Sequence, residues 1–139
     1  MNEEFKARLT EHILGEYTSP LPYYLGVSMV DLEDGRATLA LTASRATLNG
    51  YKILHGGALM TLADCAMGAA CFTYHKQVVT IDANISYLKP SPMGTRLTCA
   101  AVVRHNGKRT MVVDCDIKDA QGTLRATAHG TFFVIGEFN

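Results

Sequence analysis

Apolar residues recur with a helical period at the start of the chain. Phe5, Leu9 and Ile13 are spaced four residues apart, which is the spacing of one face of an amphipathic helix. This pattern predicts a helix over residues 2–17, within an N-terminal helical segment at 1–18. The segment Ser19-Pro20-Leu21-Pro22 follows, and because proline lacks a backbone N–H we expect the helix to stop before it.

Period-2 alternation, typical of β-strands, dominates the rest of the chain outside one long segment. From residue 79 to residue 87, five apolar residues alternate with Thr80, Asp82, Asn84 and Ser86. Asp34-Gly35 and Asn106-Gly107 are hairpin turn signals. The predicted strands cover residues 25–33, 36–43, 79–87, 95–104, 109–118 and 123–135.

The segment 57–75 has no alternation and is rich in Ala, Leu and Met, so it predicts a helix of about five turns. With its flanking residues this central helix spans 56–76. It is apolar on nearly every side, which indicates burial on nearly every side. A membrane span is the alternative, but Asp64 would place a charge near the bilayer centre, at a high free-energy cost.

The order of elements indicates the fold class. One helix and two strands precede the long helix, and four strands follow it, which favours an antiparallel α+β fold over repeated βαβ units. A single sheet and a helix that is apolar all round must bury each other. We therefore expect a single domain over residues 1–139, with the sheet curled around the central helix.

Composition excludes several classes of function. Thirteen basic and thirteen acidic residues give a formal net charge of zero, which disfavours binding to nucleic acid through a basic face. The sequence contains no long run of like charges, so we expect no charged membrane tether. The start Met1-Asn2-Glu3-Glu4 is unlike a signal peptide, and the four cysteines form no CxxC pair. We expect free thiols, a cytoplasmic protein and no metal site.

Asp64 is the residue that the helix pattern does not explain. A carboxylate in an apolar helix is costly unless it is paired, and no Lys or Arg lies between His55 and Lys76. One interpretation is a structural carboxylate that is exposed or bonded to Thr61 or to the backbone. The other is a functional carboxylate, since ionisable groups in perturbing surroundings cluster at functional sites.

The segment His55-Gly56-Gly57 stands at the start of the same helix. Free N–H groups at a helix N-terminus bind negative charge, although the segment could also be a plain junction capped by His55. Eight residues separate Gly56 from Asp64, so they lie roughly 12 Å apart along one helix. Both can act on one carbonyl only if two antiparallel copies of the helix meet, which requires a dimer.

Residues 49–90 resemble the hotdog-fold acyl-CoA thioesterases, in the branch named for phenylacetic acid degradation. The resemblance rests on Asn49, on His55-Gly56-Gly57, on Asp64 nine residues after the histidine, and on the strand 79–90. It is compatible with the chain from about residue 20 to residue 135. The sequence departs from the family at Lys52, where members often have glycine, so Asn49 could be held differently.

The resemblance implies a role for each matching residue. Asp64 would be the general base or the nucleophile, and the Gly56 N–H would stabilise the oxyanion of the thioester. Asn49 would orient water or the thioester, His55 would hold the loop or contact the thioester, and Thr80 would position water. Asp64 and Thr80 would come from one subunit and the other three residues from its partner, in a homodimer that pairs into a homotetramer.

The resemblance also implies the ligand, a small acyl- or aryl-CoA thioester with coenzyme A as product and no further cofactor. The expected substrate-binding residues are Gly57, then Leu54, Thr61, Cys65 and Gly68 for the acyl group, and Lys89, Arg104 and Arg109, with Lys108, for the phosphates. Two alternatives share the fold. One is a non-catalytic acyl-CoA-binding module, which would not need Asp64, and the other is a dehydratase or hydratase.

Overall fold

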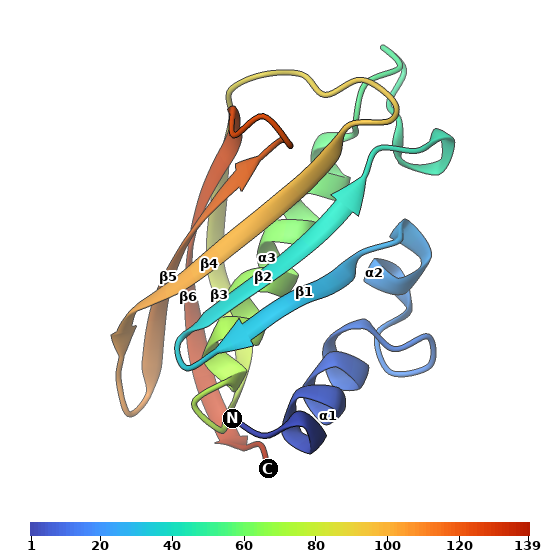
Figure 1. The fold of residues 1–139 in the computed structure, drawn as a ribbon. Coiled ribbons are helices and arrows are strands. Elements are labelled where there is room, and N and C mark those ends of the chain that lie inside the picture. The colour runs from blue at the N-terminus through green and yellow to red at the C-terminus, as the bar shows by residue number, and fades with distance from the viewer.

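A six-stranded antiparallel sheet curves around one long helix in the computed structural model, which describes residues 1–139 (Figure 1). The strand order across the sheet is β1-β2-β4-β5-β6-β3. The elements are α1 (Glu3–Leu14), α2 (Pro20–Leu25), β1 (Ser28–Glu33), β2 (Arg36–Thr42), the 3₁₀ turn η1 (Arg45–Thr47), α3 (Gly56–Phe72), β3 (Lys76–Tyr87), β4 (Arg96–Asn106), β5 (Thr110–Lys118) and β6 (Leu124–Glu137).

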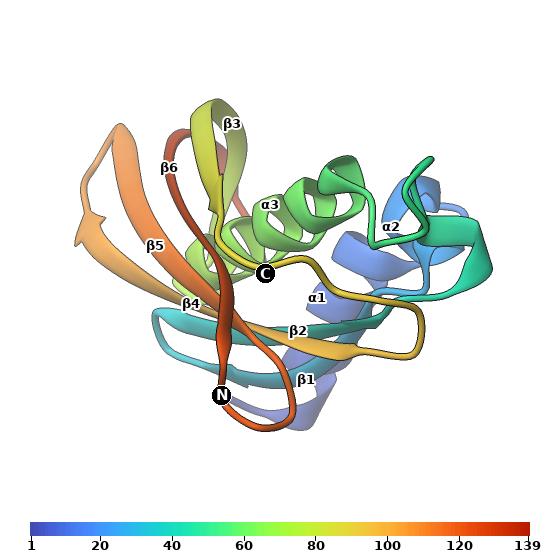
Figure 2. The same cartoon turned by 90° about the horizontal axis from the view of Figure 1, so that it is seen from above.

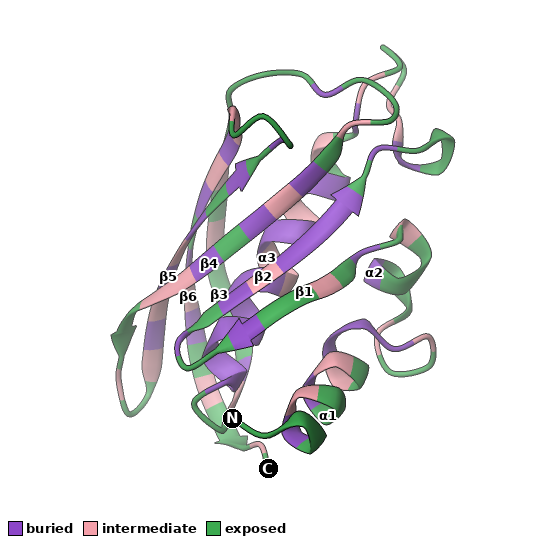
Figure 3. Ribbon diagram, in the orientation of Figure 1, coloured by how far each residue is buried: buried purple, intermediate pink, exposed green.

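The central helix α3 lies in the concave side of the sheet, as the view from above shows (Figure 2). Eleven of its seventeen residues are buried, and Figure 3 shows most of α3 and stretches of the strands in the purple of buried residues. Leu62, Ala66 and Met67 are fully buried in this layer. The predicted fold class, an antiparallel sheet curled around a buried helix, is confirmed.

The N-terminal region differs from the prediction. Helix α1 begins after Asn2, whose side chain accepts a hydrogen bond from the N–H of Phe5, and it ends at Leu14 rather than near residue 17. The prolines do not simply break the chain, because Pro20 starts the second helix α2. Proline is well suited to the first position of a helix, where its missing N–H has no intrahelical acceptor to lose. Strand β1 therefore begins at Ser28 and not at residue 25.

Helix α3 ends earlier than predicted. It stops at Phe72, and the Thr73 hydroxyl donates to the carbonyl of Ala70 while accepting from the N–H of Gly35. His75 then has a φ of 60°, in the left-handed region that ends a helix. Residues 73–75 thus form a turn, and Lys76 already pairs with β6.

Strand β3 contains a bulge that changes which side chains face the helix. The register with β6 shifts between Thr80 and Asp82, so Ile81 is the extra residue. Simple alternation placed Thr80 outward with the other polar residues. Because of the bulge, Thr80 pairs with the buried Phe132 and turns toward α3, whereas Val79 and Ile81 are 45% and 57% exposed.

Strand β3 is also an edge of the sheet, since it pairs only with β6.

The other hairpins match their turn signals within two residues, with β4 and β5 joined at Asn106-Gly107 and β6 running from Leu124 to Glu137. None of the helices combines the length and the apolar character that a membrane crossing requires.

Candidate active site

The N-terminus of α3 presents one backbone N–H that no group of the chain accepts. His55 caps the helix, and its Nδ1 accepts a hydrogen bond from the N–H of Gly57 at 2.8 Å. The carbonyl of His55 accepts from the next two N–H groups along the helix. The N–H of Gly56 has no acceptor in the chain. The free N–H of Gly56 is therefore available to a ligand, at the positive end of the helix dipole.

Tyr87 of β3 holds the same turn from the side. Its hydroxyl donates to the carbonyl of Gly56 at 2.7 Å. An added Cβ at Gly56 would lie 3.0 Å from both Cζ and Oη of Tyr87, which is closer than ordinary contact. The peptide between Gly56 and Gly57 is thus bonded at both ends, by Tyr87 and by His55, and a side chain at position 56 would make the tyrosine ring shift.

Asn49 shapes the loop that leads to this helix. Its Oδ1 accepts from the N–H of Tyr51 at 2.9 Å and from that of Ile53 at 3.3 Å, and its own N–H donates to the Ile53 carbonyl. Lys52 takes a positive φ of 61° inside this turn. The residue that departs from the family pattern therefore occupies a left-handed position without glycine, and Asn49 keeps only its Nδ2 donors free of these bonds.

Asp64 is half-buried in the middle of α3, and its partner is Thr80. The Thr80 hydroxyl donates to Asp64 Oδ1 at 2.7 Å. Thr61, the partner considered from the sequence, bonds instead to the carbonyl of Gly57. No cation of the chain forms an ion pair with Asp64. The carboxylate is thus oriented by one hydroxyl, and its second oxygen has no hydrogen bond within the chain.

Most of the predicted site residues divide between two separate cavities, whereas His55, Gly57 and Thr61 line neither of them. One, of about 350 Å³, lies at the N-terminus of α3, and the other, of about 290 Å³, lies beside Asp64. The first contains Asn49, Leu54, Gly56 and Lys89 together with Ile53, Leu59, Tyr87, Leu88, Pro90 and Ser91. The second contains Asp64, Cys65, Gly68 and Thr80 together with His12, Ile13, Thr18, Ser19, Phe72, Val78, Val79 and Phe132. Gly56 and Asp64 of one chain thus line different cavities.

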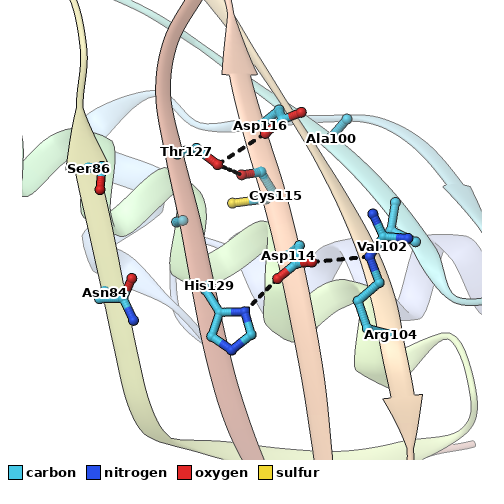
Figure 4. A pocket seen from close by; sticks show the side chains of 11 residues that line it. Asn84, Ser86, Ala100, Val102, Arg104, Asp114, Cys115, Asp116, Thr127 and His129 are labelled. Carbon is cyan, nitrogen blue, oxygen red and sulfur yellow. Dashed lines mark hydrogen bonds and ion pairs between the residues drawn. The ribbon is translucent and has the colours of Figure 1, made fainter.

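Both arginines expected near the coenzyme A phosphates lie away from these cavities. Arg104 is on the outer face of the sheet, where its Nε donates to Asp114 at 3.1 Å and Asp114 also contacts His129 (Figure 4). Arg109 is exposed at the β4–β5 hairpin. Lys89 is the predicted cation that lines a cavity with Gly56.

Burial favours the protonated form of two groups in the cavities. Burial, together with the smaller effect of the neighbouring charge of Asp64, raises the pKa of the Cys65 thiol to about 12. Cys65 is therefore a neutral thiol at physiological pH and not a nucleophile. Burial likewise raises the pKa of Tyr87, so its hydroxyl remains a hydrogen-bond donor at neutral pH.

Sequence reasoning missed two residues that line these cavities. Tyr87 could have been found from the alternation of residues 83–87, which places it on the inner face, but nothing in the pattern shows that it reaches Gly56. His12 lies on α1, which was given no part in the site, and yet it lines the cavity of Asp64.

Comparisons with known proteins agree with this geometry. The profile of the Thioesterase superfamily matches residues 51–126. The acyl-coenzyme A thioesterase PaaI of Escherichia coli is 36% identical over 112 residues, which is 81% of this chain and 80% of that protein. The solved structure of E. coli PaaI, from the phenylacetic acid degradation operon, superposes with a TM-score of 0.86 at 32% identity and 96% coverage of both chains.

A Streptococcus mutans protein bound to acetyl-CoA is a further structural relative. It superposes with a TM-score of 0.79 at 30% identity, over 82% of this chain and 92% of that one. The resemblance inferred from the segment 49–90 is thus confirmed by sequence and by structure. The chain is a thioester hydrolase with the hotdog fold, and it belongs to the thioesterase superfamily.

Proposed function

We propose that this thioester hydrolase cleaves a small acyl- or aryl-CoA ester into the free acid and coenzyme A. The E. coli relative is named an acyl-coenzyme A thioesterase, and the S. mutans relative holds acetyl-CoA. The observation that carries the proposal is the combination of a free helix N-terminal N–H at Gly56 with a half-buried carboxylate at Asp64 that only a hydroxyl orients. An oxyanion donor and an activating carboxylate are what acyl transfer to water needs.

Two copies of the chain complete the site in this proposal. Gly56 and Asp64 lie in different cavities of one chain, about 12 Å apart along α3, whereas reacting atoms must come within about 3–3.5 Å. The edge strand β3 supports such pairing, because its twelve residues offer backbone groups on one side to a second strand. Antiparallel pairing of β3 with its copy would bring Gly56 of each chain toward Asp64 of the other.

The reaction assigns one task to each group. The thioester carbonyl would accept a hydrogen bond from the Gly56 N–H, which is worth most when the oxygen becomes negative. Asp64 would either take a proton from attacking water or attack the carbonyl itself to form an anhydride. In both routes the C–S bond breaks, and the thiolate leaves and takes up a proton. When water attacks directly, it supplies the new oxygen of the free acid. When water opens the anhydride at the Asp64 carboxyl carbon, the free acid leaves with an oxygen from Asp64 and the oxygen of water enters the carboxylate. Thr80 would keep Asp64 in position.

The remaining side chains would bind the rest of the ester. Lys89 at the rim of the first cavity is the best-placed cation for a phosphate, since Arg104 already pairs with Asp114. Arg109 is exposed and has no ion-pair partner in the chain, so it is the second candidate. Leu54 and Gly56 lie beside Lys89, which is consistent with a path from the phosphates to the thioester.

Hydrolysis of a panel of acyl- and aryl-CoA esters, followed by release of free thiol, tests the proposed activity. Asp64→Asn keeps the size of the side chain and the bond from Thr80, and we expect kcat to fall by about 10²–10⁴-fold with KM near its original value. An unchanged kcat would remove Asp64 from the mechanism. A single turnover in ¹⁸O-labelled water separates the routes, because label enters the Asp64 carboxylate only through the anhydride.

A further inference from the structure

One wall of the cavity beside Asp64 comes from the N-terminus of the chain. The cavity is also lined by α3, β3 and β6, which carry the proposed chemistry. The residues of the N-terminal wall are His12, Ile13, Thr18 and Ser19, from the end of α1 and the loop that follows it. None of these residues takes part in the proposed reaction. Their role must therefore lie in contacts with the part of the ligand that the cavity holds.

The floor of the cavity follows one face of α3. Asp64, Gly68 and Phe72 are spaced four residues apart, so they lie in a row that runs about 12 Å from the carboxylate toward the C-terminal end of the helix. Gly68 is the middle of this row and has no side chain. Beyond Asp64 and Thr80, the lining on this side is apolar, with Val78, Val79 and Phe132.

The far end of the row is closed by aromatic contacts. The ring of His12 lies 5.1 Å from the ring of Phe72, and also 5.1 Å from that of Phe138 near the C-terminus. Phe138 is itself fixed, since its N–H donates to the carbonyl of His75 at 2.9 Å. The contact with Phe138 therefore holds His12 against Phe72. Helix α1, which carries His12, is itself anchored because its Phe5 and Leu9 are buried in the core.

The middle of the cavity is open because residue 68 is glycine. A Cβ added at Gly68 would lie 3.8 Å from Cε2 of Phe132, which is an ordinary contact distance. Alanine would therefore fit the fold and narrow the passage. The volume of about 290 Å³ is roughly twice that of an apolar cavity of ~150 Å³ that accepts benzene.

From this arrangement we infer that the cavity is the acyl pocket and that the N-terminal helix limits the length of its acyl group. The inference rests on the proposed thioesterase activity. The thioester lies beside Asp64, the acyl chain runs past Gly68 along α3, and the stack of His12 on Phe72 is the stop. His12 and Gly68 are thus specificity-determining residues that act on chain length and not on the chemistry.

The test compares straight-chain CoA esters of increasing length, from butyryl through hexanoyl and octanoyl to decanoyl, in three variants. His12→Ala removes the stop and should raise kcat/KM for the longer esters relative to butyryl-CoA. Gly68→Ala narrows the passage and should lower the same ratio. A single methylene in an apolar pocket discriminates by about 10- to 200-fold, so we expect a shift of about tenfold in each direction.

His75→Asn is the matched control. His75 packs on Phe5 with ring centroids 4.4 Å apart and bonds to Phe138, so it belongs to the same aromatic cluster as His12, but it does not line the cavity. Asparagine tolerates its positive φ of 60°. We expect this variant to keep the chain-length profile of the wild type, which separates loss of the stop from loosening of the helix.

The outcomes distinguish this inference from the proposed function. If the wild type hydrolyses no ester of the panel, the thioesterase proposal fails and the inference fails with it. If the wild type is active but neither His12→Ala nor Gly68→Ala changes the ratio of long to short esters, the inference alone is overturned. A profile that His75→Asn shifts as much as His12→Ala would also overturn it, because the effect would come from helix packing.

Discussion

Replacement of Gly56 by proline tests the proposed oxyanion donor directly. Gly56 is the first residue of α3, where proline is tolerated because the N–H has no intrahelical acceptor. The preceding residue, His55, has a φ of −64° and a ψ of 135°, which is the backbone region that a following proline requires. Gly56→Pro therefore removes the free N–H and leaves the start of the helix compatible with the fold.

Proline also adds a Cβ, and Gly56→Ala is the control for that effect. An added Cβ would lie 3.0 Å from Cζ of Tyr87, whereas carbon atoms in good contact are ~3.5–4.0 Å apart. The tyrosine ring would have to move by roughly half an ångström, which weakens its 2.7 Å bond to the Gly56 carbonyl. Alanine introduces the same crowding and keeps the N–H.

The kcat values of Gly56→Pro and Gly56→Ala should therefore differ by the contribution of one hydrogen-bond donor to catalysis. Because a misplacement of about 1 Å at a reacting centre costs on the order of 10²-fold, we expect Gly56→Ala to lower kcat by about tenfold. Gly56→Pro should lower it by a further 10²–10³-fold, roughly what loss of one oxyanion-hole donor costs.

Initial rates of thiol release give kcat and KM, and thermal unfolding verifies that both variants are folded. A double-mutant cycle with Tyr87→Leu, which removes the crowding ring, should show that Gly56→Ala costs little in that background. Equal kcat values for folded Gly56→Pro and Gly56→Ala would refute the assignment of the N–H as oxyanion donor.

Further predictions concern other residues of the site and of the fold. Thr80→Val removes the hydroxyl that bonds to Asp64, so kcat should fall about tenfold or more with little change in KM, in steady-state assays. Lys89→Ala should raise KM for CoA esters and leave kcat unchanged; an unaltered KM would exclude Lys89 from phosphate binding. Iodoacetamide at pH 8 should leave Cys65 unmodified by mass spectrometry, because its pKa of about 12 keeps the thiolate fraction near 10⁻⁴. Backbone N–H groups of its turn and an arginine lower the pKa of Asp119, so its carboxylate stabilises the fold above its unfolded pKa of about 3.9. That stabilisation is lost as pH falls through the lower folded pKa, so the deficit in Tm of Asp119→Asn at pH 7 should shrink below about pH 4 in thermal scans.

The arrangement of the sheet and central helix followed from periodicity alone. Alternation predicts the strands. A helix that is apolar on all sides must be buried, so the order of the elements is compatible with few folds. The ends of elements were harder to predict. Pro20 begins α2 instead of only ending α1, and the Thr73 hydroxyl at the end of α3 accepts a hydrogen bond from Gly35, which is distant in sequence. Such contacts exist only once the chain has folded.

The candidate site, like the fold, could be predicted only in part from the sequence. Asp64 could be identified because a carboxylate conflicts with an apolar helix, and Gly56 because of its place at a helix start. The bond from Thr80 could not be predicted, because strict alternation turns Thr80 outward and only the bulge after it turns it inward. The packing of His12 against Phe72 joins segments sixty residues apart, and no local pattern indicates it.

The central claim is a thioesterase site shared between two chains, and mixing two inactive variants tests it most directly. In a hybrid dimer of Asp64→Asn with Gly56→Pro, one site carries both substitutions and the other site is intact. We predict that co-refolding or co-expression of the two variants restores thiol release from a CoA ester that neither variant hydrolyses alone. Hybrid dimers that form, as verified with two affinity tags, but stay inactive would contradict the shared site.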